Sequence, residues 1–264
     1  MKKLIYLFFA FSIFLFSCQE DKDVNKDPYQ YETLEHFYTQ ASVLKVEIAY
    51  EPNAEPYVSG GFGSSVNFDF TQNNLTALFA QRSRPIQVLI DKQLNQMTQI
   101  PSQNKTSFTS ADIRDLSDDY QVEQSTEDQT VVFLVFLDGY YSLNGQNQNT
   151  VLGFSAGSHA VAIFKPVLEA ITGGGVLGSN PKYQVEQATI VHEVAHAIGL
   201  VNAGVDMHVA HQDAAHGKHC SNTDCVMYWT NEGPSGASGL FGGASVNEIV
   251  FGQECIDDIT NYLN

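Results

Sequence analysis

Basic residues are scarce in this chain of 264 residues: 13 lysines and arginines stand against 30 aspartates and glutamates, giving a formal net charge of −17. A chain this acidic disfavours nucleic acids and anionic membrane surfaces as partners, because both repel negative charge. It also lacks a glycine-rich phosphate-binding loop that ends in lysine and a hydroxyl residue. The remaining classes are enzymes and binding proteins whose ligands are neither nucleic acids nor anionic membranes and are not held by such a phosphate-binding loop.

Long apolar runs are also missing, apart from the one that opens the chain. A basic start, Met1-Lys2-Lys3, precedes apolar residues 4–16. This run is too short for a transmembrane helix and has the pattern of a signal peptide. The following Leu15-Phe16-Ser17-Cys18 resembles the bacterial lipobox, which implies cleavage before Cys18 and lipidation of that residue. The alternative is an ordinary secretory signal in which the cysteine occurs by chance.

Residues 19–23 are polar and mostly acidic, and they resemble the tags that direct lipoproteins to the outer surface of some Gram-negative bacteria. We therefore expect an exported protein, lipid-anchored in the bacterial cell envelope at the outer membrane, periplasmic or on the cell surface. The expected organisation is a lipoprotein signal peptide at 1–17, an acidic tether at 18–40 and one domain at 41–264. This domain is long enough to bury a sizeable core.

The clearest chemical motif is HExxHxxG, from His192 to Gly199. On a helix with about 3.6 residues per turn, His192 and His196 share one face and can hold one zinc ion. Glu193 beside them is placed to act as the general base for a zinc-activated water. Six of the eight histidines lie between 192 and 219, a clustering that favours a metal site over a helix with two satisfied buried histidines.

The residues that follow the motif indicate the third zinc ligand, because they resemble those of a known peptidase family. The metzincin pattern HExxHxxGxxH places a histidine where this chain has Asn202, a poor zinc ligand. However, residues 219–227 reproduce the HCxxxxCxM tail of the archaemetzincins. Gly199 and His219 are 20 positions apart, against 3 in the family, which leaves 17 extra residues at about 201–217. The resemblance implies His219 as third ligand, and the alternatives are His211, His216, Asp206 and Asp213.

The same resemblance assigns the residues around this tail. Met227 corresponds to the methionine of the Met-turn, which packs beneath the zinc ligands, and Tyr228 is either a packed aromatic residue or a stabiliser of the oxyanion. Archaemetzincins continue to a CxxC pair that helps to build a second, four-cysteine zinc site. Here Cys255 is the sole downstream cysteine, so a four-cysteine site is impossible, and we expect a disulfide between Cys220 and Cys225.

Apolar patterning outlines the rest of the domain. It predicts strands at 43–50, 86–90, 130–137 and 158–164, and helices at 73–81, 111–120 and 246–263. This order resembles the metzincin domain and implies an α+β fold, in which a twisted mixed β-sheet lies on the active-site helix and an irregular C-terminal subdomain ends in a helix. By the resemblance, the strand at 159–164 is a candidate sheet edge for an extended peptide, or else an ordinary core strand.

These features predict a lipid-anchored zinc metalloendopeptidase that acts on peptides or proteins. In it Zn²⁺ is held by His192, His196 and His219, and Glu193 is the base. One alternative is a non-catalytic surface lipoprotein whose zinc is absent or structural, because four protein ligands would close the site. Another is a zinc hydrolase of non-peptide amides. The retained Glu193, which a pure binding protein does not need, favours an enzyme.

Overall fold

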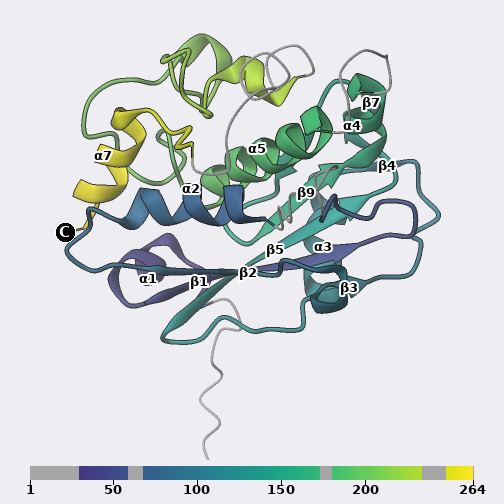
Figure 1. The fold of residues 1–264 in the computed structure, drawn as a ribbon, viewed down its shortest axis with the longest axis horizontal. Coiled ribbons are helices and arrows are strands. Elements are labelled where there is room, and N and C mark those ends of the chain that lie inside the picture. Colours follow the sequence, from purple (N-terminus) through teal and green to yellow (C-terminus); the bar gives the residue numbers. More distant parts are fainter. Residues whose placement is uncertain (1–29, 59–67, 173–179, 234–247, 264) are drawn as a thin grey trace, which may run out of the picture.

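The computed structural model describes residues 30–58, 68–172, 180–233 and 248–263 of the chain. Its main sheet has six strands (Figure 1), in the order β2-β1-β5-β9-β8, with β3 pairing with the far end of β1. All neighbours are parallel except β8 and β9. The bounds are β1 Val43–Tyr50, β2 Gln87–Ile90, β3 Thr98–Gln99, β5 Gln129–Leu137, β8 Gly153–Ser155 and β9 Ala160–Phe164.

A second, three-stranded sheet adjoins the main one. It contains β4 (Ser107–Phe108), β6 (Tyr140–Leu143) and β7 (Gln146–Gln148), with β6 in the middle. The hairpin between β6 and β7 turns at Asn144 and Gly145, which have φ angles of 52° and 75°. Asparagine and glycine adopt this left-handed backbone more readily than other residues, so the turn chemistry sets where the hairpin reverses.

Helices cover the main sheet. Helices α2 and α5 lie side by side above it in Figure 1, with α7 beyond α2, and α3 lies against β9 from the opposite side. Together with short 3₁₀ turns the helical elements are α1 Leu34–Thr39, α2 Asp69–Phe79, η1 Leu94–Gln96, α3 Ser110–Tyr120, α4 Lys165–Thr172, α5 Asn180–Ala197, η2 Ala214–His216, η3 Trp229–Glu232 and α7 Gln253–Asn261. None of the helices in the described ranges is long and apolar enough to cross a membrane.

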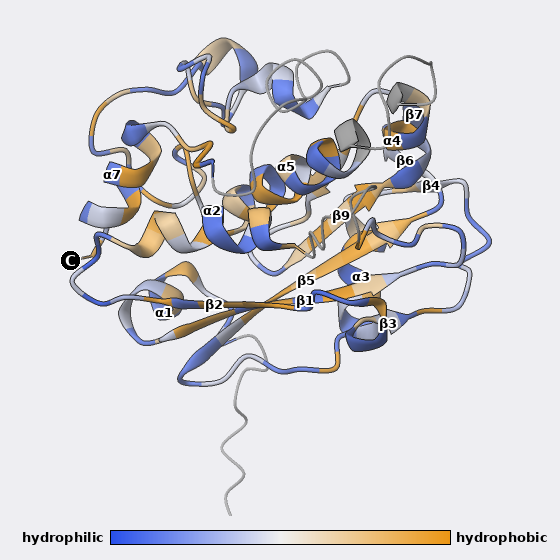
Figure 2. Ribbon diagram, in the orientation of Figure 1, coloured by the Kyte–Doolittle hydropathy of each residue, from blue (hydrophilic) through white to orange (hydrophobic). Residues whose placement is uncertain are grey.

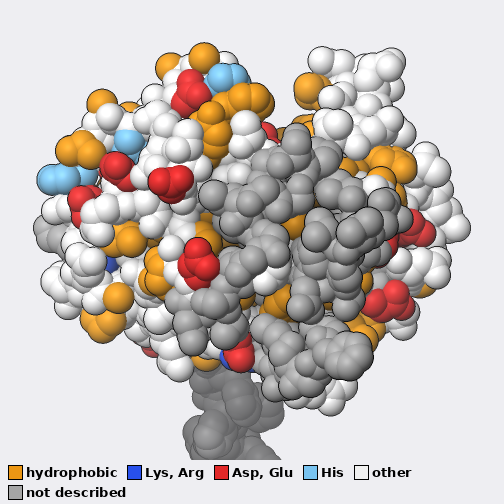
Figure 3. Space-filling view, turned by 45° about the horizontal axis from the view of Figure 1, so that its top comes forward, with side chains coloured by type: hydrophobic (Ala, Val, Ile, Leu, Met, Phe, Trp, Pro, Cys, Tyr) orange, Lys and Arg blue, Asp and Glu red, His pale blue; other side chains and the backbone are white. Residues whose placement is uncertain are grey.

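The core lies between these layers. β9 is apolar and buried along its whole length, and β5 is apolar from Val131 to Leu137 (Figure 2). Such continuous apolar strands are expected for parallel strands covered on both faces. Outside the core the visible described surface carries scattered acidic side chains and very few basic ones (Figure 3), as the net charge requires.

The expected α+β class with a mixed sheet is confirmed, and so is the strand at 43–50. The predicted helix at 246–263 was too long, because α7 begins after Gly252 and ends at Asn261; residues 246 and 247 lie outside the described ranges. The predicted tether also reached too far. It included α1, whose Phe37 and Tyr38 are buried, and the Tyr38 hydroxyl donates a hydrogen bond to the Ile198 carbonyl at 2.8 Å.

Of the two interpretations of the strand at 159–164, the ordinary core strand is confirmed and the sheet edge is wrong. β9 contains most of residues 159–164, but it is paired on both sides, with β5 and with β8. The outer strand is β8, which the sequence pattern did not predict. Its antiparallel direction follows from a short hairpin to β9, because strands joined by so short a connection cannot run parallel.

A buried ion pair joins α4 to α5. Lys165 Nζ lies 2.7 Å from Glu186 Oε2, and the two side chains are 4% and 0% exposed. Lys165→Met is expected to lower the free energy of unfolding by about 3–5 kcal/mol, because it leaves a buried carboxylate without its partner. Urea denaturation checks this. Lys92→Met, which breaks the half-exposed pair with Asp69, should cost under about 1 kcal/mol, and an equal cost for both would contradict the prediction.

Candidate metal centre

Helix α5 supplies the first half of the centre. His192 and His196 lie one turn apart, with their Nε2 atoms 3.1 Å from each other. The Nδ1–H of His192 donates to the Val226 carbonyl at 2.8 Å, which turns Nε2 toward His196. This second hydrogen bond fixes the ring and its tautomer, as is usual for histidines that bind metal. Both side chains therefore direct their Nε2 atoms to one point.

The chain reverses direction at Gly199, two residues after α5 ends. Gly199 has a φ of 93°, and a Cβ there would lie 2.7 Å from Leu34 Cδ1. Any other residue would therefore be strained and would collide with α1. This reversal allows the segment after the helix to return to the histidine pair.

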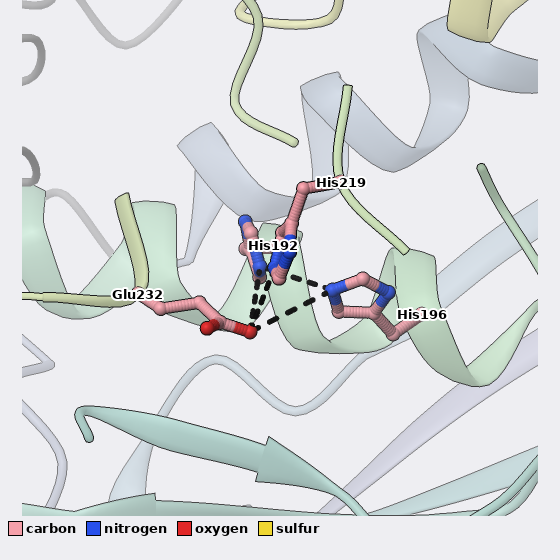
Figure 4. A group of neighbouring side chains, drawn as sticks. All are labelled: His192, His196, His219 and Glu232. Carbon is pink, nitrogen blue, oxygen red and sulfur yellow. Dashed lines mark hydrogen bonds and ion pairs between the residues drawn. The ribbon is translucent and has the colours of Figure 1, made fainter. Parts of the chain in front are cut away.

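His219 comes back to the pair from this segment (Figure 4). Its ring centroid lies 5.3 Å from that of His192 and 5.1 Å from that of His196. The His219 Nδ1–H donates to the His216 carbonyl at 2.5 Å. The buried Nε2 atom faces the histidine pair, and its ion-pair partner is the carboxylate of Glu232. A buried nitrogen that converges with two other imidazole nitrogens suits a metal ligand.

Glu232 is the fourth side chain at this point, and sequence reasoning missed it (Figure 4). Its Oε1 atom lies 2.8 Å from His219 Nε2, 3.7 Å from His192 Nε2 and 4.0 Å from His196 Nε2. It ends η3, which follows Met227 closely in the sequence. No short motif contains Glu232, so the folded chain alone reveals it.

The four side chains fit a zinc ion. One ligand atom from each lies within 4.8 Å of the others. Zinc–nitrogen bonds of 2.0–2.1 Å in a tetrahedron place ligand atoms about 3.3 Å apart, and the distances of 2.8–4.0 Å bracket this value. Imidazole and carboxylate are also the donor types that zinc accepts. The three histidines and Glu232 are thus able to hold it without rearrangement of the backbone.

Two charge states in the centre agree with this fit, and one does not: burial lowers the pKa of His219, but its contact with Glu232 outweighs burial and raises that pKa. Burial and the neighbouring imidazoles of His192 and His219 lower the pKa of His196, which keeps its lone pair free. Burial alone would raise the pKa of Glu232, but its contacts with His192 and His219 hold it well below its usual range. The fourth group is therefore an ionised carboxylate.

Glu193 lies beside the four side chains but is not one of them. Its carboxyl is buried, its Oε1 atom has no hydrogen-bond partner among the described residues, and the Ser155 backbone N–H donates to the group. Burial, and then the charge of Glu232, raise the pKa of Glu193 well above its ordinary value. A carboxyl with a raised pKa binds a proton more readily, as a general base must.

A cleft of about 390 Å³ opens beside the centre. Its lining includes Glu193, His196, His219 and Glu232 on one side, and Phe154 and Ser155 of β8 on another. β8 passes so close to α5 that a Cβ at Gly153 would lie 2.6 Å from Glu193 Cγ. Glycine at this position is therefore what lets the edge strand border the cleft.

Residues 153–157 read G-F-S-A-G, the spacing of a serine nucleophile elbow. The structure excludes that role, since an elbow needs a strand, a sharp turn and a helix. Here Ser155 ends β8, which continues through a short hairpin into β9. The Ser155 hydroxyl donates to the Gly157 carbonyl at 3.0 Å, so the motif belongs to an edge strand.

The other candidate ligands lie elsewhere. The Asn202 amide donates to Gln212 Oε1 at 3.1 Å. The His216 ring is exposed and stacks on Trp229, with centroids 4.0 Å apart, and its Nδ1 pairs with Asp213 at 2.7 Å. Asp206 is exposed, and its side chain lines a separate pocket beside α7. His211 binds Asp258, as described below, so none of these residues joins His192 and His196.

Met227 is fully buried in a tight turn that supports the centre. The Tyr228 N–H donates to the Cys225 carbonyl at 3.0 Å, and the Cys220 N–H donates to the Met227 carbonyl at 2.7 Å. The buried Asn231 amide donates to the Val226 carbonyl, the same oxygen that accepts from His192. Sequence reasoning missed Asn231, which links the turn to the metal ligands. Tyr228 is partly buried.

The predicted disulfide is replaced by free thiols. Cys220, Cys225 and Cys255 are all buried and unbonded, and Cys225 Sγ lies 3.6 Å from Cys255 Sγ. The expectation was wrong because it treated the pair as a local bridge, whereas α7 brings a third sulfur to the same place. Cys18, the expected lipidation site, lies outside the described residues.

Comparisons with known proteins give little support to any one family. No protein-family model matches the chain, and no curated protein matches it. Among solved structures, the chain is similar to a zinc-dependent peptidase from Methanocorpusculum labreanum, with 10% identity and a TM-score of 0.43 over 81% of this chain and 99% of that one. A similarity of this size identifies neither a family nor an activity.

Proposed function

We propose that this domain is a zinc-dependent peptidase. The observation that carries the proposal is the convergence of three histidine Nε2 atoms beside the buried Glu193 carboxyl, at the wall of a cleft. His192, His196 and His219 would hold the zinc. When bound, zinc supplies a Lewis acid for the scissile carbonyl and lowers the pKa of a coordinated water.

Glu193 performs the proton transfers in this proposal. Its carboxylate takes a proton from the attacking water and then delivers it to the leaving amine, so the group is unchanged after each cycle. The raised pKa of Glu193 suits both steps, because the proton must be held between them. No other carboxyl of the described residues lines the cleft except Glu232, whose pKa is lowered.

Substrate would lie along β8 in an extended form. β8 is an outer strand of the sheet and borders the cleft, and its other side pairs with β9. In an antiparallel ladder alternate residues point their backbone groups away from the partner strand. The outward Ser155 N–H already donates to Glu193, and the other outward groups would bind an extended peptide by adding a strand to the sheet. This supports peptides, rather than small amides, as the substrate class.

Glu232 affects whether a zinc ion in this centre could be catalytic. A catalytic zinc keeps one position open to water, whereas a fourth protein ligand closes the site. Glu232→Gln is expected to weaken zinc binding about tenfold, equivalent to about 1.4 kcal/mol, and to raise peptide hydrolysis, because the amide is a poorer ligand. Chelator competition and peptide cleavage measure the two effects.

Asp224→Asn is the matched control for Glu232, since Asp224 is exposed and its loss changes the net charge equally. The control should leave both zinc affinity and cleavage unchanged. Unchanged zinc affinity in Glu232→Gln would show that the carboxylate is not a ligand. A loss of cleavage with full zinc affinity would instead assign Glu232 to the reaction itself.

The closed arrangement also favours a second candidate, a surface lipoprotein that binds a partner and uses zinc for structure. One experiment separates the two functions. Metal content is measured by mass spectrometry on the purified protein, and hydrolysis of a random peptide library is followed with and without a chelator. One zinc bound at this centre with chelator-sensitive cleavage supports the peptidase. Bound zinc without cleavage, including in Glu232→Gln, supports the binding protein.

We further propose that the protein is exported and lipid-anchored through Cys18, because residues 15–18 have the lipobox pattern after an apolar run. Cells grown with a labelled fatty acid should incorporate it into the wild-type protein and not into Cys18→Ala. Cys220→Ala serves as the control, since its thiol is buried in the domain. Equal labelling of all three proteins would rule out Cys18 as the modified residue.

A further inference from the structure

A second group of ligating side chains lies apart from the histidine centre. His211, Cys220 and Cys255 bring one ligand atom each within 4.8 Å of the others. Cys225 is not within that distance of all three, but its Sγ atom lies 3.6 Å from Cys255 Sγ. The three cysteines are 0% exposed and His211 is 5% exposed. These four residues, called here the thiol cluster, come from the insertion, the His219 segment, the Met227 turn and α7.

Two distances in the thiol cluster are close to those of a tetrahedral metal site. Zinc–sulfur bonds of about 2.3 Å separate two sulfur ligands by about 3.8 Å, and a sulfur and a nitrogen ligand by about 3.6 Å. The Cys225–Cys255 distance is 3.6 Å, and His211 Nδ1 lies 3.2 Å from Cys220 Sγ. The sulfurs are thus close enough to share an ion and are not bonded to each other.

Polar neighbours hold these ligands in place. Asp258, which is fully buried on α7, accepts the Nε2–H of His211 at 2.7 Å and the backbone N–H of His208 at 2.7 Å. The His211 Nδ1 atom is thereby directed at Cys220. The Asn222 backbone N–H donates to Cys220 Sγ at 3.4 Å. A carboxylate behind a histidine, and an N–H on a sulfur, are the usual supports of bound metal.

We propose that the thiol cluster binds a second, structural zinc ion, with His211, Cys220, Cys225 and Cys255 as its four ligands. A Cys₃His set leaves no open position, so this ion does no chemistry. The site differs from the four-cysteine site of the family that the sequence resembles, because the chain lacks the CxxC pair. Instead, His211 comes from the inserted segment and one lone cysteine comes from the terminal helix.

The second ion would also order the first centre. Cys220 directly follows His219, and the His211 carbonyl accepts the Ser221 N–H at 2.7 Å. A metal on Cys220 would therefore fix the backbone that carries His219. Loss of this ion should release the insertion and α7 together, since both provide ligands to it.

Metal content and cobalt spectra of the purified full-length protein test this proposal. The His192→Ala/His196→Ala variant disables the first centre, and we expect it to retain one zinc per chain. Cobalt in that variant should show thiolate-to-cobalt charge-transfer absorption, which histidine and carboxylate ligands alone cannot give. His211→Ala in the same background should lose the zinc, whereas His208→Ala, an exposed histidine of the same insertion, should keep it.

The test does not depend on the variants folding, because cobalt-loaded wild-type protein must show the same thiolate absorption. Its absence would overturn the proposal, as would a native disulfide between any two of Cys220, Cys225 and Cys255 detected by mass spectrometry after alkylation. Failure of peptide hydrolysis leaves this result unaffected, since the spectrum reports the thiolates and not the catalytic centre.

Discussion

Replacing Glu193 with glutamine is expected to reduce kcat for peptide hydrolysis by roughly 10²–10⁴-fold, the usual contribution of a general base. The amide cannot take a proton from water, yet it has nearly the volume of the carboxyl that it replaces in this buried position. None of the four candidate metal ligands is altered. Zinc content should therefore stay at the wild-type level, and kinetics with one fluorogenic peptide alongside metal analysis checks both quantities.

Glu35→Gln is the control for this variant, because Glu35 is an exposed glutamate on α1. It should be indistinguishable from wild type in both assays. Turnover within a factor of about two of wild type in Glu193→Gln would remove Glu193 from the proposed chemistry. Loss of zinc together with turnover would show instead that Glu193 supports the ligands.

His219→Ala is expected to have the largest effect on metal binding. Structural zinc sites with four ligands gain about 10–16 kcal/mol, so one ligand contributes on the order of 3 kcal/mol, or about 100-fold in affinity. The contact of His219 Nε2 with Glu232 Oε1, at 2.8 Å, would be lost as well. Zinc affinity of the first centre should fall by at least this factor and peptide cleavage should disappear; competition with a chromophoric chelator measures the affinity.

His216→Ala is the comparison for His219. Its exposed ring stacks on Trp229, and only its backbone carbonyl accepts the bond from His219. The alanine variant keeps that carbonyl, so zinc affinity should be retained within about threefold, which is under 1 kcal/mol. Equal losses in the two variants would mean that the return segment as a whole, and not the His219 ring, determines binding.

Much of the fold could be predicted from the sequence, because its strongest elements have local signals. β1 and β5 are long apolar strands, and the pattern before Gly199 belongs to a helix. β8 had no such signal. It has three residues, and its place depends on the hairpin to β9 and on the absence of a side chain at Gly153. Neither condition is visible in a periodic pattern.

The candidate site divides in the same way. His192, Glu193 and His196 lie in one motif on one helix turn, so spacing alone brings them together. The positions of Glu232, Asn231 and His211 could not be predicted in this way. They depend on chain reversals whose direction no local sequence pattern indicates. The expected disulfide shows the limit most clearly, since the proximity of Cys220 and Cys225 in the sequence concealed the approach of Cys255 from α7.

The position of α1 limits where an anchored molecule could work. Leu34 at its start lines the cleft and packs on Gly199 and Gly204, so the chain enters the fold at the cleft itself. Sixteen positions separate Cys18 from Leu34, and a fully stretched chain of that length covers at most about 55 Å. A lipid on Cys18 would therefore hold the mouth of the cleft within about 55 Å of the bilayer. Only polypeptides that come within this distance of the membrane could be cut.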